Sequence, residues 1–294
     1  MINSNEPLVS IITPSYNQGE FIGDTILSVK NQNYSNIEHI IIDGGSTDNT
    51  LEIIKKYEGA YNMTWISEKD EGQSDAVNKG FNMAKGEIIG WLNSDDIYIF
   101  KDTVEKIVYA FKTNPDAKII YGDALIINKE NVIKRVHITP NFDYRRLLRY
   151  CFIVQPSVFF RRDVIKENKL KKELDYAMDY EFWLRLGEKY KFIHVNQIIA
   201  ADRNHSQRKN LPGHIGVFNE KNFLIKTYNS QERGLEFFVN WVKDRLFIRW
   251  LRVKGIKLLL NLYKIKNDFT VDLELEPKLK VLYTQLVGKN SQLF

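Results

Sequence analysis

Short apolar runs alternate with segments of helical spacing along the first 113 residues. Runs rich in β-branched residues predict strands at 8–12, 37–42, 63–67 and 87–90. Apolar residues spaced three and four apart predict helices at 20–30 and 50–57, from Ser74 onward, and at 102–113. Strands that alternate with helices indicate a parallel sheet with crossover helices, so we expect an α/β fold.

Each of these four predicted strands runs into a polar or acidic loop, at Thr13, Asp43, Ser67 and Asn93. Because proline cannot continue a ladder, we expect the first strand to end before Pro14. The carboxyl ends of parallel strands meet at one edge of a sheet, which is where open α/β sheets bind ligands. The four loops therefore predict a continuous cleft.

The pattern changes after Asp116. Residues 119–123 and 132–136 resemble a hairpin, and further strands are expected at 156–160 and 192–195, with a helix at 180–186 between them. This half should extend the sheet with mixed strands and build the far wall of the cleft. We expect one domain over 1–212, in two halves at about 1–100 and about 101–212.

The chain becomes helical and basic from about Ile215, so we place a boundary near Pro212–Gly213 and a separate region at 213–294. Aromatic and basic residues mingle there. One interpretation is an amphipathic segment on an anionic membrane surface, and the other is a helical lid or an oligomer contact whose aromatic residues are core. Nucleic-acid binding is disfavoured because no recognition motif accompanies the charge.

Composition narrows the class of protein. The 294 residues are 44% hydrophobic, carry a net charge of +5 and include one cysteine, Cys151, which excludes an internal disulfide and favours a reducing compartment. The start lacks a signal-peptide pattern, and no apolar run reaches the roughly 20 residues of a membrane span. We expect a cytoplasmic protein, peripheral at most on the inner face of the membrane. Walker, G-x-G-x-x-G and H-E-x-x-H motifs are absent.

The segment from Trp91 to Asp96 organises the candidate chemistry. It follows a buried run and presents Asp95 and Asp96 at the end of a predicted strand. Carboxylate oxygens there suit a divalent cation that shares its coordination with substrate phosphates. The alternative is a polar loop in which one of these acids caps the next helix.

Five segments in this order resemble family-2 glycosyltransferases, over roughly residues 8–205. They are residues 9–17 (VSIITPSYN), 41–48 (IIDGGSTD), 70–80 (DEGQSDAVNKG), 93–96 (NSDD) and Asp179 with 181–185 (EFWLR). The resemblance implies a Rossmann-like A-type glycosyltransferase fold with a mixed, mostly parallel central sheet and a C-terminal helical appendage. It also implies a nucleotide-diphospho-sugar donor, a divalent metal (Mg²⁺ or Mn²⁺) and inversion at the anomeric carbon. With it, the domain over 1–212 is expected to be the catalytic domain, with a nucleotide-binding half at about 1–100 and an acceptor-binding half at about 101–212.

The resemblance assigns the nucleotide and sugar contacts as follows. Thr13, Pro14 and Tyr16 would contact the nucleoside, and Asp43 would accept a hydrogen bond from the base. Gly44 stands where relatives often carry a second acid. The residues that would approach the sugar or diphosphate are Asp75, Asn78, Lys79, Asn93 and Ser94. Each has a structural alternative, as a loop, capping or solvated helix residue.

The resemblance assigns the remaining roles to four residues. Asp95 and Asp96 would bind the metal, joined by His205, while Asn93 replaces the first acid of the usual Asp-x-Asp. Asp179 would be the general base, and its alternative is a helix cap. Glu181 is the poorer choice because it lies inside the predicted helix.

We therefore expect a hexosyltransferase-type enzyme that moves a sugar from a UDP- or dTDP-linked donor to a hydroxyl of a glycan or lipid-linked acceptor. Cell-surface polysaccharide biosynthesis is the expected pathway. The alternatives are a nucleotide-sugar-binding protein without turnover and a sugar nucleotidyltransferase. The latter would be expected to carry a glycine-rich, basic loop after its first strand, and the sequence has none there.

Overall fold

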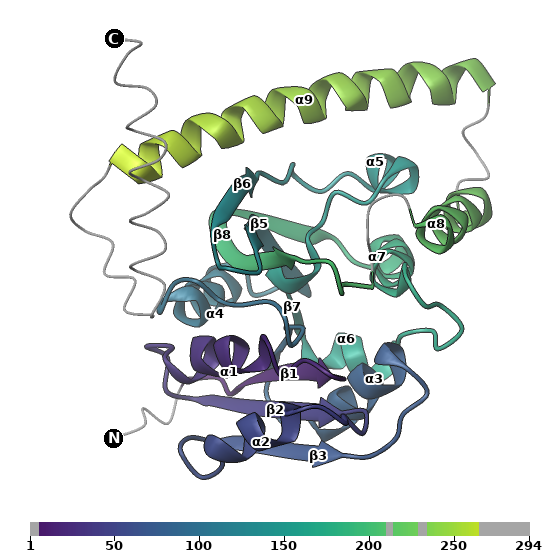
Figure 1. Cartoon of the computed structure of the whole chain (residues 1–294). Helices are drawn as coiled ribbons and strands as arrows, with labels where there is room; N and C mark the ends of the chain where they lie inside the picture. Colours follow the sequence, from purple (N-terminus) through teal and green to yellow (C-terminus); the bar gives the residue numbers. More distant parts are fainter. Residues whose placement is uncertain (1–5, 210–213, 229–233, 265–294) are drawn as a thin grey trace.

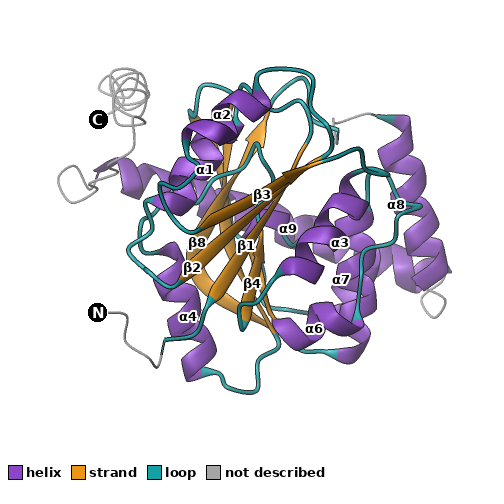
Figure 2. Ribbon diagram, turned by 90° about the horizontal axis from the view of Figure 1, so that it is seen from below, coloured by secondary structure: helices purple, strands orange, loops and turns teal. Residues whose placement is uncertain are grey.

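Eight strands form one mixed sheet with helices on both faces (Figures 1 and 2). The computed structural model describes residues 6–209, 214–228 and 234–264. The strands are β1 (Val9–Ser15), β2 (Ile37–Asp43), β3 (Met63–Ser67), β4 (Ile88–Trp91), β5 (Ile119–Asn128), β6 (Ile133–His137), β7 (Val158–Arg161) and β8 (Phe192–Asn204). The α-helices are α1 (Ile22–Lys30), α2 (Thr50–Lys56), α3 (Gln73–Met83), α4 (Thr103–Thr113), α5 (Tyr144–Arg149), α6 (Arg162–Glu167), α7 (Met178–Lys189), α8 (Ile215–Tyr228) and α9 (Gly234–Lys264).

The sheet order is β3-β2-β1-β4-β7-β5-β6, and β8 pairs with β5. The first four strands are parallel, as the alternating pattern predicted. β7 is antiparallel to both β4 and β5, and β5 and β6 form the expected hairpin. β8 returns parallel to β5 along its whole length. The predicted α/β fold with a mixed, mostly parallel sheet is confirmed.

Two apolar layers hold the sheet. Apolar residues of α3, α6 and α7 cover one face, with Trp91 and Trp183 among the largest buried side chains. Residues of α1, α2 and α4 cover the other face. Strands buried on both sides have continuous apolar runs, which explains the sequence pattern of β1, β2 and β4. The core thus fixes the carboxyl ends of these strands at one edge.

Two strands are longer than the sequence predicted. β1 continues through Pro14 to Ser15, because pairing with β4 stops at Ile12 and only β2 accompanies the rest. A proline fits where one side of a strand has no partner. β8 continues to Asn204 although polar residues interrupt its apolar run, because irregularities in its pairing with β5 absorb the break.

The basic region contains two helices, α8 and α9. The expected boundary at Pro212–Gly213 lies outside the described residues. α9 runs along the open edge of β6, and a Cβ on Gly255 would lie 2.5 Å from the carbonyl oxygen of Val136 (Figure 1). This contact covers an edge strand that would otherwise be open to pairing. Among the described residues, no helix combines the length and apolarity needed to cross a membrane.

Candidate active site

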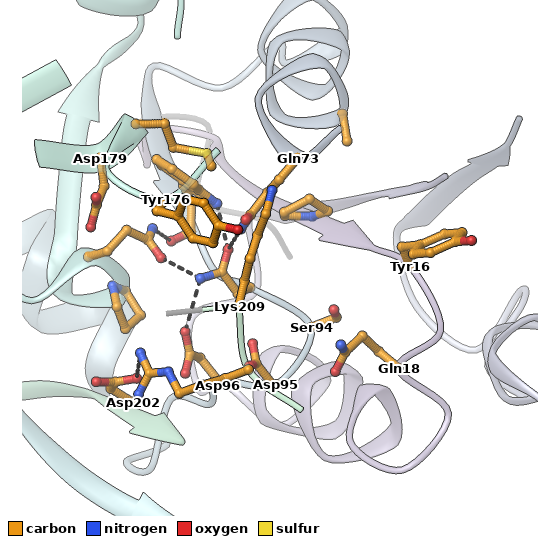
Figure 3. Close-up of a pocket in the computed structure, with 18 of the residues that line it drawn as sticks. Tyr16, Gln18, Gln73, Ser94, Asp95, Asp96, Tyr176, Asp179, Asp202 and Lys209 are labelled. Atoms are coloured by element: carbon orange, nitrogen blue, oxygen red, sulfur yellow. Dashed lines mark hydrogen bonds and ion pairs between the residues drawn. The ribbon is translucent and has the colours of Figure 1, made fainter. Parts of the chain in front are cut away.

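A pocket of about 700 Å³ opens at the carboxyl ends of β1 and β4. The first residues of α3 and α7 and the end of β8 complete its walls. Tyr16 and Gln18 lie at one end, Asp179 and Asp202 at the other, and Asp95 with Asp96 between them (Figure 3). The size suits a small-molecule ligand. The structure thus joins loops from both halves of the predicted catalytic domain.

Residues from the first three strand-end loops line the Tyr16 end. Pro14 and Tyr16 belong to this wall, and Tyr16 is 58% exposed. Gly44 and Asp70 face each other there, since a Cβ on Gly44 would lie 2.6 Å from Oδ2 of Asp70. The Asp70 carboxylate therefore occupies space that a side chain at position 44 would need.

Thr13 and Asp43 lie outside the lining of the pocket. Thr13 is fully buried, and its hydroxyl is 2.9 Å from Nε2 of His39. Oδ2 of Asp43 accepts hydrogen bonds from the backbone N–H groups of Gly45 and Ser46 and from the hydroxyl of Ser67, at 2.7–3.0 Å. Its Oδ1 accepts one from the Ser46 hydroxyl at 2.5 Å. Asp43 thus holds the shape of the loop that carries Gly44.

Three residues of α3 that were expected to approach the sugar or diphosphate are paired outside the pocket lining. Asp75 pairs with Lys172 at 2.5 Å, and Lys79 pairs with Glu68 at 2.7 Å. The Asn78 amide donates to the carbonyl of Leu170 and accepts from its N–H, both at 2.9 Å. Asp75 and Asn78 thus tie α3 to the segment before α7, and Lys79 ties it to the residue after β3. The structure does not bring Asp75, Asn78 or Lys79 into the lining of the pocket.

Asn93 is a junction between three elements of the site. Its Oδ1 accepts hydrogen bonds from Nε2 of Gln73 and Nε1 of Trp91, both at 2.9 Å. Its Nδ2 donates to Oε1 of Gln155 at 2.8 Å and to Oδ2 of Asp96 at 3.3 Å. An amide satisfies both roles, whereas a carboxylate accepts only. Ser94 follows it, buried in the pocket wall.

Asp95 and His205 meet beside the pocket. Oδ2 of Asp95 lies 3.0 Å from Nε2 of His205, although 110 residues separate them. The His205 ring is buried against Phe21, with 4.4 Å between ring centroids. Its Nδ1 has no hydrogen-bond partner among the described residues. The structure therefore brings these two candidate metal ligands together.

Asp96 and Asp202 make the pocket strongly acidic from its centre toward the end opposite Tyr16. Burial raises the pKa of Asp96 well above its ordinary value, and the charges of Asp95 and Asp202 add to the effect. Burial also raises the pKa of Asp202, although its ion pair with Arg208, at 3.1 Å, acts in the opposite direction. Buried like charges favour a bound cation, because it removes their mutual repulsion.

Asp179 lies in the first turn of α7 and lines the pocket. Its Oδ1 accepts a hydrogen bond from the backbone N–H of Tyr180 at 2.7 Å. Burial raises the pKa of the Asp179 carboxyl, and the positive charge of Lys221 opposes that rise. Glu181, by contrast, is fully buried and paired with Lys171 and Arg185. Of the two acids, Asp179 has access to a ligand.

The acidic centre fits a divalent cation only in part. No group of three or more His, Cys, Asp or Glu side chains within the described ranges is arranged to hold a metal. Asp95 and His205 supply an oxygen and a nitrogen at one point, and Asp96 adjoins them. Such an incomplete set suits a cation that takes its other ligands from substrate phosphates and water.

A family model described as "Glycosyl transferase family 2" matches residues 10–180. The chain belongs to glycosyltransferase family 2. Two relatives of this family-2 chain differ in how much of their own length it matches. The hyaluronan synthase of Pasteurella multocida is 29% identical over 234 residues, 79% of this chain but 24% of the synthase. The Escherichia coli UDP-Glc:alpha-D-GlcNAc-diphosphoundecaprenol beta-1,3-glucosyltransferase WfgD is 31% identical over 179 residues, 61% of this chain and 69% of WfgD. The chain therefore spans about a quarter of the synthase's length.

Two solved structures share the fold of this family-2 chain, although their sequences are only 14–20% identical to it. S. aureus TarS 1-349 in complex with UDP-GlcNAc has a TM-score of 0.59 at 20% identity, covering 78% of this chain and 68% of that one. The mannosyltransferase PcManGT from Pyrobaculum calidifontis, in complex with GDP-Man and Mn²⁺, has a TM-score of 0.57 at 14% identity, covering 99% and 81%. The expected A-type glycosyltransferase fold is thereby confirmed.

The sequence analysis did not identify several residues that line the pocket. Asp202 and Arg208, on either side of His205 in the sequence, form an ion pair in the pocket wall. Asp202 ends an apolar run, as Asp43 does, and an acid in that position could have identified it as a candidate. Arg135 also lines the pocket, but its place in a hairpin strand gave no indication of that.

Proposed function

We propose that the chain is an inverting, metal-dependent glycosyltransferase. It would move a sugar from a UDP- or dTDP-linked donor to a hydroxyl of a glycan or lipid-linked acceptor, in cell-surface polysaccharide biosynthesis. The observation that carries the proposal is the convergence of Asp95 and Asp179 on one pocket, with His205 against Asp95 just outside its lining. WfgD, whose name describes a UDP-glucose donor and a lipid-diphosphate acceptor, supports the assignment of both substrates.

The nucleotide is proposed to lie at the Tyr16 end. The exposed Tyr16 ring and Pro14 offer an apolar surface to the nucleoside. Asp70, beside Gly44, offers a carboxylate that can accept a hydrogen bond from the base or ribose. In this proposal Asp43 acts indirectly, because its hydrogen bonds maintain the loop on which Gly44 lies.

The diphosphate is proposed to lie over Asn93–Asp96. Asp95 and His205, with Asp96 beside them, would hold a divalent cation there. When bound, Mg²⁺ or Mn²⁺ would supply charge neutralisation for the departing nucleoside diphosphate. The complex of PcManGT with Mn²⁺, a protein of the same fold, supports such an ion. Asn93 would keep Asp96 and Gln155 in place around it.

Asp179 is proposed to be the general base. Its carboxylate would accept the proton of the acceptor hydroxyl while that oxygen bonds to the anomeric carbon and the bond to the diphosphate breaks. Attack from the side opposite the leaving group inverts the anomeric centre. The raised pKa of Asp179 suits this task, because a base with a higher pKa holds the proton better.

The decisive experiment is Asp179→Asn, with Asp163→Asn as the matched control. Asp163 occupies the same first-turn position on α6, and its Oδ1 also accepts from the following N–H, at 2.9 Å, outside the pocket. Asp179→Asn should reduce transfer at least about 10²-fold and leave UDP binding near wild type. Asp163→Asn should leave both unchanged. Normal turnover by Asp179→Asn would remove Asp179 from the role, and donor binding without any turnover in wild type would favour a binding protein.

The outer face of α9 is proposed to rest on an anionic membrane surface. Val239, Leu246, Trp250 and Val253 are 41–63% exposed and follow one stripe of the helix at spacings of seven, four and three. The only acid between residues 239 and 255 is Asp244, which faces inward to Arg146 and Arg149. An apolar stripe flanked by cations favours the interface of an anionic bilayer.

A further inference from the structure

One end of the pocket contains an arginine, Arg135, with an unpaired donor. Arg135 is half-buried in the pocket wall, and its buried Nε has no hydrogen-bond partner among the residues that the structure describes. Within the described part of the chain, no carboxylate lies at ion-pair distance from its guanidinium. A buried N–H donor normally has a hydrogen-bond partner, so this unpaired Nε needs an explanation.

The sheet fixes the direction of this side chain. Arg135 on β6 pairs with Ile126 on β5, which pairs in turn with Asp202 on β8. Directly paired residues point to the same face of a sheet, and all three line the pocket. β6 is the last strand on the side away from β1, so Arg135 lies at the end opposite Tyr16.

The charges around Arg135 are mixed. Burial lowers its pKa, and the charge of Arg252, an exposed residue of α9 outside the pocket lining, acts in the same direction, whereas Asp202 opposes both. His137, two residues along β6, adds no charge near neutral pH, because burial and then Arg135 lower its pKa to about 4. Ile126, Ile153 and Val154 give the pocket lining an apolar part.

We propose that Arg135 binds the diphosphate of a lipid-linked acceptor. A guanidinium matches phosphate oxygens with paired N–H donors, so a side chain in the pocket wall with an unpaired N–H suits such an anion. The donor diphosphate lies elsewhere in the proposed function, over Asn93–Asp96, so this site faces the acceptor. The apolar wall suits the first part of a lipid chain. The inference rests on the proposed function for its orientation of donor and acceptor.

The test measures binding and requires no turnover. Decyl diphosphate is titrated calorimetrically into the full chain with UDP and Mn²⁺ in excess, so that the donor site is filled. We expect wild type to bind it and Arg135→Ala to bind at least about tenfold more weakly. The matched control is Lys134→Ala, since Lys134 is adjacent on β6 but exposed and outside the lining. It should bind like wild type, and decyl glucoside should bind weakly to all three proteins.

Further measurements separate a binding role from a structural one. Arg135→Ala should melt no lower than wild type, because it removes a buried donor without a partner and relieves repulsion from Arg252. Arg135→Lys, which keeps the charge and loses the paired donors, should bind with intermediate affinity. Unchanged binding by Arg135→Ala overturns the proposal, as does competition between decyl diphosphate and UDP. Tighter binding of a glucuronate-terminated oligosaccharide than of decyl diphosphate would also overturn the proposal, because it would show that Arg135 binds a carboxylate and not a diphosphate. If Asp179→Asn shows no effect on transfer but this binding pattern holds, only the proposed function fails.

Discussion

At the scale of single residues, Asn93 is satisfied only as an amide. Restoring the acid of the usual motif, by Asn93→Asp, would set a carboxylate against Oε1 of Gln155 and Oδ2 of Asp96. We expect a loss of stability of about 1–3 kcal/mol and a clear fall in kcat. Thermal melting and steady-state kinetics with Mn²⁺ would measure both. Higher activity in Asn93→Asp would show that the position serves the metal and not the hydrogen-bond junction.

If Asp179 is the general base, as proposed, the acid limb of the pH–rate profile reports its titration. Burial raises its pKa, so kcat/KM should fall as the pH decreases through a value above that of an ordinary aspartate. Lys221 opposes this rise, so Lys221→Ala should move the limb to higher pH. Lys226→Ala, an exposed lysine on the same helix α8, should leave the profile unchanged. A limb that does not move in Lys221→Ala would assign the titration to another group.

The sequence predicted the position of the pocket better than it predicted which acids line it. Asp95 and Asp96 were singled out because carboxylates end a buried apolar run, and Asp179 because of the family resemblance; the pocket lining contains all three. Asp43 looks the same in the sequence, yet its carboxylate turns into its own loop. Which way a loop side chain turns depends on contacts such as Ser67, which lies 24 residues away. No local pattern encodes that.

At the scale of elements, two helical glycines make a matched pair. A Cβ on Gly80 of α3 would lie 2.3 Å from Cγ2 of buried Ile12 on β1, whereas one on Gly23 of α1 would lie 3.6 Å from Ile53. Gly80→Ala should destabilise by about 1–3 kcal/mol, because the core there has no room. Gly23→Ala should stabilise by about 0.4–1 kcal/mol, through lower entropy of the unfolded chain. Urea unfolding of both variants is the measurement, and equal effects would contradict the close packing of α3 on β1.

Some ends of helices and strands cannot be predicted from the local sequence pattern. Periodicity predicted β2 and β3 well, since both strands are defined by short apolar runs with clear ends. The same pattern predicted that β8 ends at Val195, whereas the strand continues to Asn204. The extension depends on pairing with β5, which supplies a partner for every residue from Asp202 to Asn204. That pairing joins segments about 75 residues apart, so it is a property of the fold and not of the segment.

At the scale of the whole molecule, α9 connects the pocket to an exposed surface. Its inner side covers the edge of β6, the strand that carries Arg135. Leu251 and Phe247 pack there with Val136, and Asp244 pairs with two arginines of the α5 segment. The outer side presents the apolar stripe and cations. A lipid-linked acceptor leaving a bilayer under α9 would therefore reach the Arg135 end of the pocket first.

This arrangement predicts salt-sensitive binding to anionic vesicles. Leu246→Ser with Trp250→Ser should weaken binding at least about tenfold, because two of the most exposed apolar side chains of the stripe are lost. Tyr109→Ser, which removes an apolar residue of 68% exposure on α4, is the control and should bind like wild type. Vesicle sedimentation in low and high salt measures the effect, and transfer to a water-soluble acceptor should stay constant. Equal binding to neutral and anionic vesicles would exclude the electrostatic part of the proposal, and unchanged binding by the double variant would place the contact on another surface.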